Sequence, residues 1–170
     1  ERMEKLTSAD ILEYIRCQTT LFSRGEELTC EEISDGNINY VYRVQSGSRR
    51  SVIVKYAHWE IRTSGNPLST DRSRIESSAL LFERETAGSC APEVYRYDEE
   101  KCLLIMEDLF DYENLRYALM ERRTFPTLAR DITDFMVRTL ILSTDMVLDP
   151  MEKKKRVGAF INPMLCRITE

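Results

Sequence analysis

A lysine inside an apolar β-strand pattern is the feature that most restricts what this chain can fold into. The stretch EEISDGNINYVYRV places Asp35, Gly36 and Asn37 between two strand-like runs. These three residues tolerate the backbone angles of a tight turn, which predicts a β-hairpin. The next strand-like run, SVIVKYA, contains Lys55 after three apolar residues. An ammonium group in such a strand is costly unless it meets an opposite charge or water, so the fold has to supply one of the two.

Composition excludes several classes of partner. The chain has 170 residues and a net charge of −5, with 24 basic and 29 acidic side chains. It therefore lacks the excess of basic residues that is typical of proteins that bind nucleic acid or an anionic membrane. No run approaches the ~18 apolar residues of a membrane span, and the first stretch, ERMEKLTSAD, lacks the apolar core of a signal peptide. Five widely spaced cysteines without a CxxC pair indicate reduced thiols. We therefore expect a cytoplasmic protein with neither nucleic acid nor a membrane as its partner.

Apolar periodicity and turn residues predict five strands and one long helix in the first part of the chain. Thr7 and Asp10 form a capping signal for a short first helix. The long helix begins after Thr70, whose hydroxyl can cap it, and ends at about Thr86, before Gly88. The predicted strands are residues 28–34, 38–45, 51–57, 93–98 and 102–107.

The pattern becomes helical after the fifth strand. One helix is predicted within residues 111–122, a longer one from Thr127 onward, and a third over 150–160. We therefore predict an α+β protein with a first domain over residues 1–109 and an incomplete helical domain over 110–170.

The longer helix carries an apolar stripe. Because exposed apolar side chains favour burial against another surface, the stripe predicts one of two outcomes. Either the chain self-associates through residues 127–148, for example as a homodimer, or the helices over 111–122 and 150–160 pack over the stripe. The stripe consists of Leu128, Ile132, Phe135, Met136, Leu140 and Leu142.

The order of elements is that of the N-lobe of a protein kinase: a turn between two strands, a lysine on the third strand, a helix with an inward glutamate, and two further strands. Backbone N–H groups of the turn can approach phosphates, the lysine supplies positive charge to the α- and β-phosphates, and the glutamate holds the lysine. Glu76 lies 21 residues after Lys55 (76 − 55 = 21), on one helix face with Ala79, Leu80 and Glu83.

Taken singly, these residues have simpler explanations. The turn could be an ordinary hairpin, Lys55 could reach water, and Glu76 could be a solvated helix residue. The turn also has one glycine where protein kinases use three. The ordered set favours the kinase-like lobe, while the residues alone leave both interpretations open.

Longer motifs carry a family resemblance. The stretches EISDGNINYVYRV, VIVKYA, LSTDRSRIESSALL, APEVYRYD and MEDL together resemble the N-lobe of the methylthioribose kinase family, and NPMLCRITE is similar to a segment further along that family's chain. The resemblance implies a protein-kinase-like N-lobe, with a five-stranded antiparallel sheet and a helix, followed by the first helices of a truncated C-lobe. It also implies a sugar kinase that uses ATP and Mg²⁺ to phosphorylate the 1-hydroxyl of methylthioribose in methionine salvage.

The resemblance assigns residues to the nucleotide site. Lys55 would contact the phosphates, and Glu76 would pair with Lys55. In the hinge motif MEDL, the backbone of Glu107 and Leu109 would hydrogen-bond the adenine edge, and Asp108 would contribute through its backbone. The nucleotide loop would consist of Gly36, Asn37, Ile38 and Asn39.

Two parts of the family pattern differ in this chain. The family's catalytic-loop motif HGDLH and its metal-binding motif DPE have no counterpart, so the general base and the magnesium ligands are expected outside the chain. The chain is then expected to contain no catalytic or metal-binding residue, to be an N-terminal piece of the enzyme, and to be inactive alone. The loop AHWEIRTSGNPLS, with Trp59, also departs from the family's longer loop with a Trp-Pro pair.

Two alternatives to a methylthioribose kinase remain open. One is another small-molecule kinase of the same fold, acting on an aminoglycoside or choline, because the N-lobe mostly binds nucleotide and the C-lobe would decide the acceptor. The other is a non-catalytic nucleotide-binding module.

Overall fold

The structure, a computed structural model, describes residues 5–33 and 38–161. Its residue contacts divide the chain into two compact units. Among the described residues, the first unit comprises the chain up to Ser78 together with Val94–Asp108, and the second comprises Ala79–Glu93 and Leu109–Ile161. The described residues of the predicted nucleotide site therefore belong to the first unit, with the exception of Leu109.

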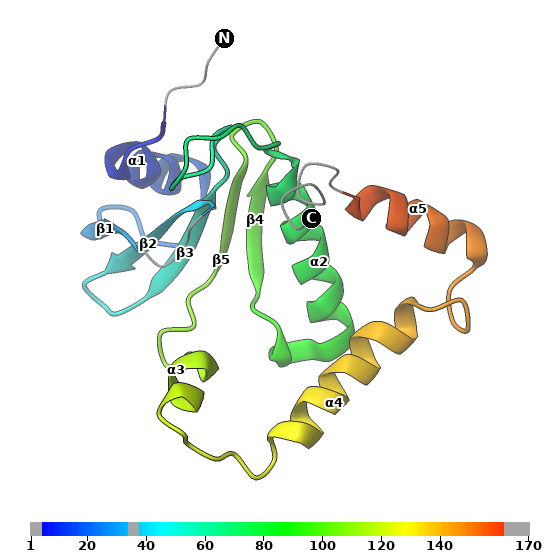
Figure 1. The fold of residues 1–170 in the computed structure, drawn as a ribbon. Helices are drawn as coiled ribbons and strands as arrows, with labels where there is room; N and C mark the ends of the chain where they lie inside the picture. Colours follow the sequence, from blue (N-terminus) through cyan, green and yellow to red (C-terminus); the bar gives the residue numbers. More distant parts are fainter. Residues whose placement is uncertain (1–4, 34–37, 162–170) are drawn as a thin grey trace. The chain divides into compact units, whose positions relative to one another are not determined.

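The first unit is built on a five-stranded sheet (Figure 1). The strand order is β1-β2-β3-β5-β4, and all neighbouring strands are antiparallel. The predicted α+β class with a five-stranded antiparallel sheet is therefore confirmed. The strands are β1 (Leu28–Glu32), β2 (Tyr40–Ser46), β3 (Ser51–Tyr56), β4 (Val94–Asp98) and β5 (Leu103–Glu107).

The first two strands are shorter than predicted on the side of the Asp-Gly-Asn turn. Strand β1 ends at Glu32, although the N–H of Ile33 still donates to the carbonyl of Val41 at 2.7 Å. Strand β2 begins at Tyr40 rather than at residue 38, because the carbonyl of Ile38 accepts a hydrogen bond from a loop residue outside the sheet.

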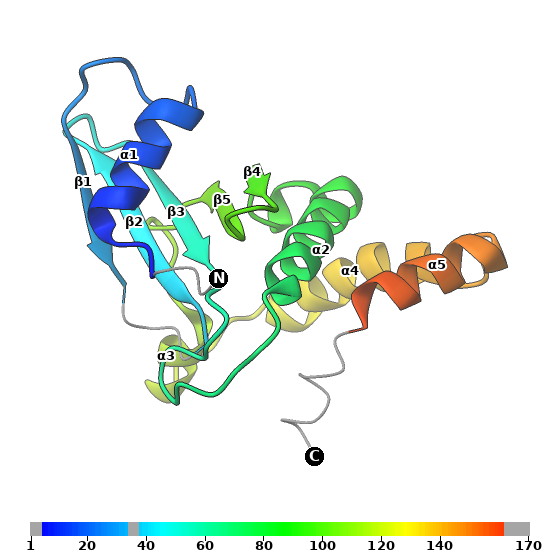
Figure 2. The ribbon, with the colours of Figure 1, turned by 90° about the horizontal axis from the view of Figure 1, so that it is seen from above.

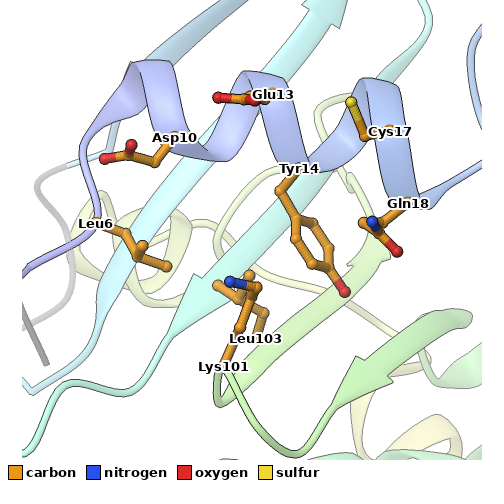
Figure 3. Close-up of a pocket in the computed structure, with 8 residues that line it drawn as sticks. All are labelled: Leu6, Asp10, Glu13, Tyr14, Cys17, Gln18, Lys101 and Leu103. Carbon is orange, nitrogen blue, oxygen red and sulfur yellow. The ribbon is translucent and has the colours of Figure 1, made fainter.

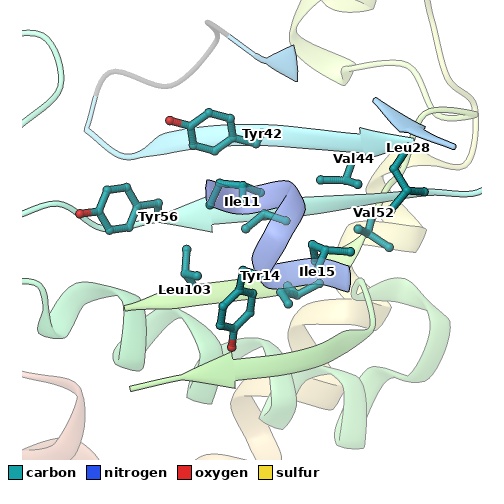
Figure 4. Close-up of a cluster of buried hydrophobic side chains, with 11 residues drawn as sticks. Ile11, Tyr14, Ile15, Leu28, Tyr42, Val44, Val52, Tyr56 and Leu103 are labelled. Atoms are coloured by element: carbon teal, nitrogen blue, oxygen red, sulfur yellow. The ribbon is translucent and has the colours of Figure 1, made fainter. Parts of the chain in front are cut away.

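Helix α1 (Ser8–Gln18) covers one face of the sheet, along the first three strands (Figure 2). The predicted capping box is present: the Thr7 hydroxyl accepts from the N–H of Asp10, and the Asp10 carboxylate accepts from the N–H of Thr7. This satisfies backbone donors that the first turn of a helix leaves unpaired. Figure 4 shows the core under the helix. It consists of Ile11, Tyr14, Ile15, Leu28, Tyr42, Val44, Val52, Val54, Tyr56, Leu103 and Ile105.

The opposite face of the sheet carries the candidate site. Successive side chains of a strand point to opposite faces, and directly paired residues of neighbouring strands share a face. Because Val54 lies in the core beneath α1, its neighbour Lys55 points to the other face, together with its partners Val41 and Leu104. The same alternation places Arg43, Ile53 and Met106 on that face. We call this surface the Lys55 face.

Helix α2 (Asp71–Ala87) begins in the first unit and continues into the second. Its end agrees with the prediction, because Gly88 follows with φ +63°, a left-handed conformation that glycine adopts at low cost. A short 3₁₀ turn, η1 (Gly88–Cys90), then leads to β4.

The second unit also contains the helices α3 (Leu115–Met120), α4 (Leu128–Leu140) and α5 (Pro150–Phe160) and the 3₁₀ turn η2 (Ile141–Ser143). Helix α3 begins only at Leu115, inside the predicted range 111–122, because the Asn114 side chain accepts from the N–H of Arg116 and caps the helix there. No helix within residues 5–33 and 38–161 combines the length and the apolar character needed to cross a bilayer.

Much of the apolar stripe on α4 is exposed. The side chains of Ile132, Met136 and Leu140 are 45%, 48% and 54% exposed. Self-association through this surface stays a prediction.

Candidate functional site

Lys55 of β3 and Glu76 of α2 form the ion pair that their sequence positions predict. Lys55 Nζ lies 2.5 Å from Glu76 Oε1, and the two side chains are 28% and 30% exposed. A partly exposed pair of this kind contributes only about 0–1 kcal/mol to stability, so its main effect is to fix where the ammonium lies. An ammonium has three donors, and Glu76 uses one of them, so Lys55 can also donate to an anionic ligand.

Small side chains bring α2 close to the sheet beside this pair. Ser73 and Ser77 are spaced by four residues, lie on one face of α2, and are 1% and 3% exposed. The Ser73 hydroxyl donates to the carbonyl of Cys102 at 3.4 Å, just before β5. Bulkier residues at these two positions would push Glu76 away from Lys55.

The part of the Lys55 face beside the lysine is largely apolar. Val41 and Leu104 flank Lys55 on the neighbouring strands, and Ile53 and Met106 lie two residues further along β3 and β5. Val41 and Ile53 are partly exposed, whereas Leu104 and Met106 are buried. Partly exposed apolar side chains next to a cation suit a ligand that has an aromatic ring at one end and negative charge at the other.

An arginine–aspartate pair lies at the hinge end of the same face. Arg43 Nε lies 2.6 Å from Asp108 Oδ2, and a terminal guanidinium nitrogen donates to Asp108 Oδ1 at 3.2 Å. The Asp108 side chain is only 3% exposed. The hydrogen bond that Arg43 donates to Asp108 raises the pKa of Arg43 above its ordinary value. The Asp108 carboxylate thus ties the hinge to β2, a role that differs from the predicted contribution of its backbone.

The two residues on either side of Asp108 lie in different units. Glu107 is the last residue of β5 and pairs with Val52 of β3. Leu109 belongs to the second unit, is 42% exposed, and accepts a hydrogen bond on its carbonyl from the N–H of Tyr112 at 2.9 Å. Their contacts to adenine stay a prediction.

The predicted nucleotide loop is described only in part. Gly36 and Asn37 lie outside the described residues. The carbonyl of Ile38 accepts from the N–H of Arg62 at 3.1 Å, and Asn39 Oδ1 accepts from Arg72 Nε at 2.7 Å. The carboxamide oxygen of Asn39 is therefore already engaged inside the protein.

The lone histidine is part of the packing around the loop that follows β3. The His58 ring lies 6.2 Å from the Tyr40 ring and 5.8 Å from the Tyr56 ring, measured between centroids, and its Nδ1 accepts from the N–H of Glu60 at 3.4 Å. Within residues 5–33 and 38–161, no three His, Cys, Asp or Glu side chains gather as they would around a metal ion.

A pocket of about 320 Å³ lies on the α1 side of the sheet, away from the Lys55 face (Figure 3). Asp10 and Glu13 of α1 and Lys101 of the β4–β5 turn line it, together with the Tyr14 ring. The Tyr14 hydroxyl donates to Asp98 Oδ2 at 2.6 Å. Burial, together with this hydrogen bond, raises the pKa of Tyr14 to about 12. The two carboxylates that line the pocket would repel the phosphates of a nucleotide, so the pocket fits the predicted ligand less well than the Lys55 face.

Two arginines of the site were not predicted. Arg43 and Arg72 look like ordinary solvated arginines in a chain of which 31% is charged. The side chains that accept from them, Asp108 and Asn39, lie 65 and 33 residues away, so no local side-chain pattern indicates these pairs.

Comparison with known proteins identifies relatives. No protein-family model matches the chain. Methylthioribose kinase from Bacillus velezensis is 40% identical over 153 residues, which are 88% of this chain and 39% of that relative. Methylthioribose kinase from Exiguobacterium sibiricum is 37% identical over 169 residues, which are 98% of this chain and 43% of that relative.

A third relative gives the same result. Methylthioribose kinase from Geobacillus thermodenitrificans is 37% identical over 88% of this chain and 39% of its own length. The chain therefore spans about two fifths of the length of these relatives. The resemblance predicted from the motifs is confirmed: the chain is related in sequence, over almost its whole length, to the methylthioribose kinase family.

Proposed function

We propose that the Lys55 face binds ATP, and that the chain supplies nucleotide-binding residues to a sugar kinase that phosphorylates the 1-hydroxyl of methylthioribose. The observation that carries this proposal is the Lys55–Glu76 ion pair beside an apolar surface, in a chain related to methylthioribose kinases. We place this reaction in the cytoplasm and within methionine salvage.

Each group on the face has a proposed task. The Lys55 ammonium donates to oxygens of the α- and β-phosphates, while Glu76 keeps it at the position where those oxygens arrive. The adenine ring lies against the apolar side chains of Val41 and Ile53, and the Arg43–Asp108 pair holds the hinge beside it. In phosphoryl transfer such positioning and charge stabilisation account for most of the rate acceleration.

Magnesium accompanies ATP in kinases and spreads the charge that develops on the phosphates. The described residues of this chain contain no cluster of three potential metal ligands, so no residue described here is assigned to the metal.

ATP binding tests the proposal. Trp59 is the single tryptophan of the chain and follows β3, so its fluorescence can report nucleotide binding. We expect saturable binding of ATP, weakened about tenfold or more in Lys55→Ala because a charge-assisted contact to phosphate is lost. Lys101→Ala, in the β4–β5 turn, is the matched control and should bind as the wild type does. Absence of ATP binding, or equal binding by Lys55→Ala, would contradict the proposal.

A further inference from the structure

Arg72 is a buried cation in the first turn of α2. It is 6% exposed, and burial lowers the pKa of its guanidinium. Burying a guanidinium is costly unless its N–H groups find acceptors. The acceptors that Arg72 meets are neutral oxygens: three backbone carbonyls and one carboxamide.

The four acceptors come from three separate segments. Arg72 Nε donates to Asn39 Oδ1 at 2.7 Å, immediately before β2. One terminal nitrogen donates to the carbonyls of Leu68 at 3.2 Å and Ser69 at 2.7 Å, in the turn that leads into α2. The other terminal nitrogen donates to the carbonyl of His58 at 2.6 Å, just after β3. A single side chain therefore joins the start of β2, the end of β3 and the start of α2.

This cluster lies next to the Lys55–Glu76 pair. Glu76 follows Arg72 by four residues, so both side chains leave the same face of α2. The charge of Glu76 acts on Arg72 and opposes the lowering of its pKa by burial. Lys55 lies three residues before His58. Strand β3 and helix α2 are thus joined at two neighbouring places, once by the ion pair and once by Arg72.

The two connections differ in strength. The ion pair is partly open to water on both sides, and such a pair does little to hold two elements together. Arg72 makes four hydrogen bonds from a buried, planar group whose geometry allows little freedom. The rotation of α2, and with it the position of Glu76, therefore depends more on Arg72 than on the ion pair.

We propose that Arg72 is a positioning residue of the nucleotide site, which holds Glu76 against Lys55 and fixes Asn39 at the base of the nucleotide loop. The inference rests on the proposed function, because the group that Arg72 positions is the ammonium that would meet the phosphates. The hydrogen bonds of Arg72 go to Asn39, His58, Leu68 and Ser69, whereas the proposed adenine surface consists of Val41 and Ile53. Loss of Arg72 therefore weakens binding of the phosphates and leaves binding of the base unchanged.

Chemical labelling of lysines tests the positioning without nucleotide. Low-level acetylation followed by peptide mass spectrometry gives the reactivity of Lys55 relative to Lys101, an exposed lysine in the same sample. In Arg72→Lys, the new ammonium cannot make the planar set of four hydrogen bonds. We therefore expect the reactivity ratio to rise up to about fivefold, and we expect the same rise in Glu76→Gln, which loses the charge that pairs with Lys55. Arg74→Lys is the matched control, because Arg74 pairs with Asp71 in the same turn of α2. A ratio in Arg72→Lys that stays at the wild-type value overturns the proposal.

Fold integrity is checked by circular dichroism. If Arg72→Lys loses the native spectrum, Asn39→Ala decides in its place, since it removes one of the four acceptors and leaves the guanidinium with three. An unchanged reactivity ratio in Asn39→Ala then overturns the proposal.

Comparison of ATP with adenosine tests the consequence for the site. We expect Arg72→Lys to weaken ATP about tenfold and adenosine by less than about twofold, because only the phosphates lose a charge-assisted contact. Equal losses for the two ligands would mean that Arg72 only supports packing and would overturn the proposal. A wild-type chain that binds neither ligand would refute the proposed function, whereas the labelling ratio would still decide whether Arg72 positions Lys55.

Discussion

The unequal burial of Arg43 and Asp108 predicts that the two partners are not equally replaceable. Asp108 is 3% exposed and Arg43 is 31% exposed. In Asp108→Asn, the amide oxygen still accepts, and Arg43 can turn toward water or toward Glu31, whose carboxylate lies 3.8 Å away. We therefore expect a loss of about 1–2 kcal/mol in the free energy of unfolding. In Arg43→Met, the buried carboxylate loses its donor, and removing one partner of such a pair costs about 3–5 kcal/mol.

Urea unfolding followed by circular dichroism measures both losses. The double variant Arg43→Met/Asp108→Leu removes the buried charge together with its partner, so it should be more stable than Arg43→Met alone. Arg50→Met, at an exposed position before β3, is the matched control and should change stability by less than about 0.5 kcal/mol. Equal losses in the two single variants, or a double variant no more stable than Arg43→Met alone, would refute the reasoning.

Three further predictions concern the core, pH and assembly. Ile105→Ala, at a position that is 0% exposed, should lower the free energy of unfolding by about 2–5 kcal/mol in urea melts. Burial raises the pKa of Tyr14, Tyr42 and Tyr97 to about 12, so the contribution of these tyrosines to stability is constant below the unfolded value of about 10 and is lost as pH rises from about 10 to about 12. Over this pH range, tyrosinate absorbance measures the ionisation of the tyrosines and circular dichroism measures unfolding. Ionisation of all tyrosines at the unfolded pKa would contradict the prediction. Phe135→Asp should abolish concentration-dependent association in sedimentation, and a wild-type chain that is monomeric at all concentrations would contradict the assembly prediction.

The strands and helices were predictable because their signals are local. The apolar run along 51–57 and the capping box at Thr7 and Asp10 depend on neighbours within a few residues, and the structure contains both elements. The missed boundaries have long-range causes. Strand β2 begins at Tyr40 because the preceding Ile38 is bound by Arg62, a contact that periodicity cannot indicate.

Some residues of the candidate site could likewise be predicted from the sequence, and others could not. Lys55 and Glu76 could be paired from sequence because the order of elements and the family motifs assign them matching positions on β3 and α2. The acceptors of Arg72 could not be predicted, because three of them are backbone carbonyls, which every residue carries. Only the folded loop between β3 and α2 brings these oxygens to one point.

The alternation that separates the α1 face from the Lys55 face has a consequence for insertions and deletions. A strand that slips by one residue exchanges its two sets of side chains. Suppose that one residue is deleted from the β2–β3 turn and that β3 shifts by one position in its pairing with β2. Lys55 would then point into the core beneath α1, and Val54 would point to the ligand surface. A substitution in one set therefore changes either the core or the ligand surface, whereas a length change in a central strand would remove stability and ligand binding in a single step.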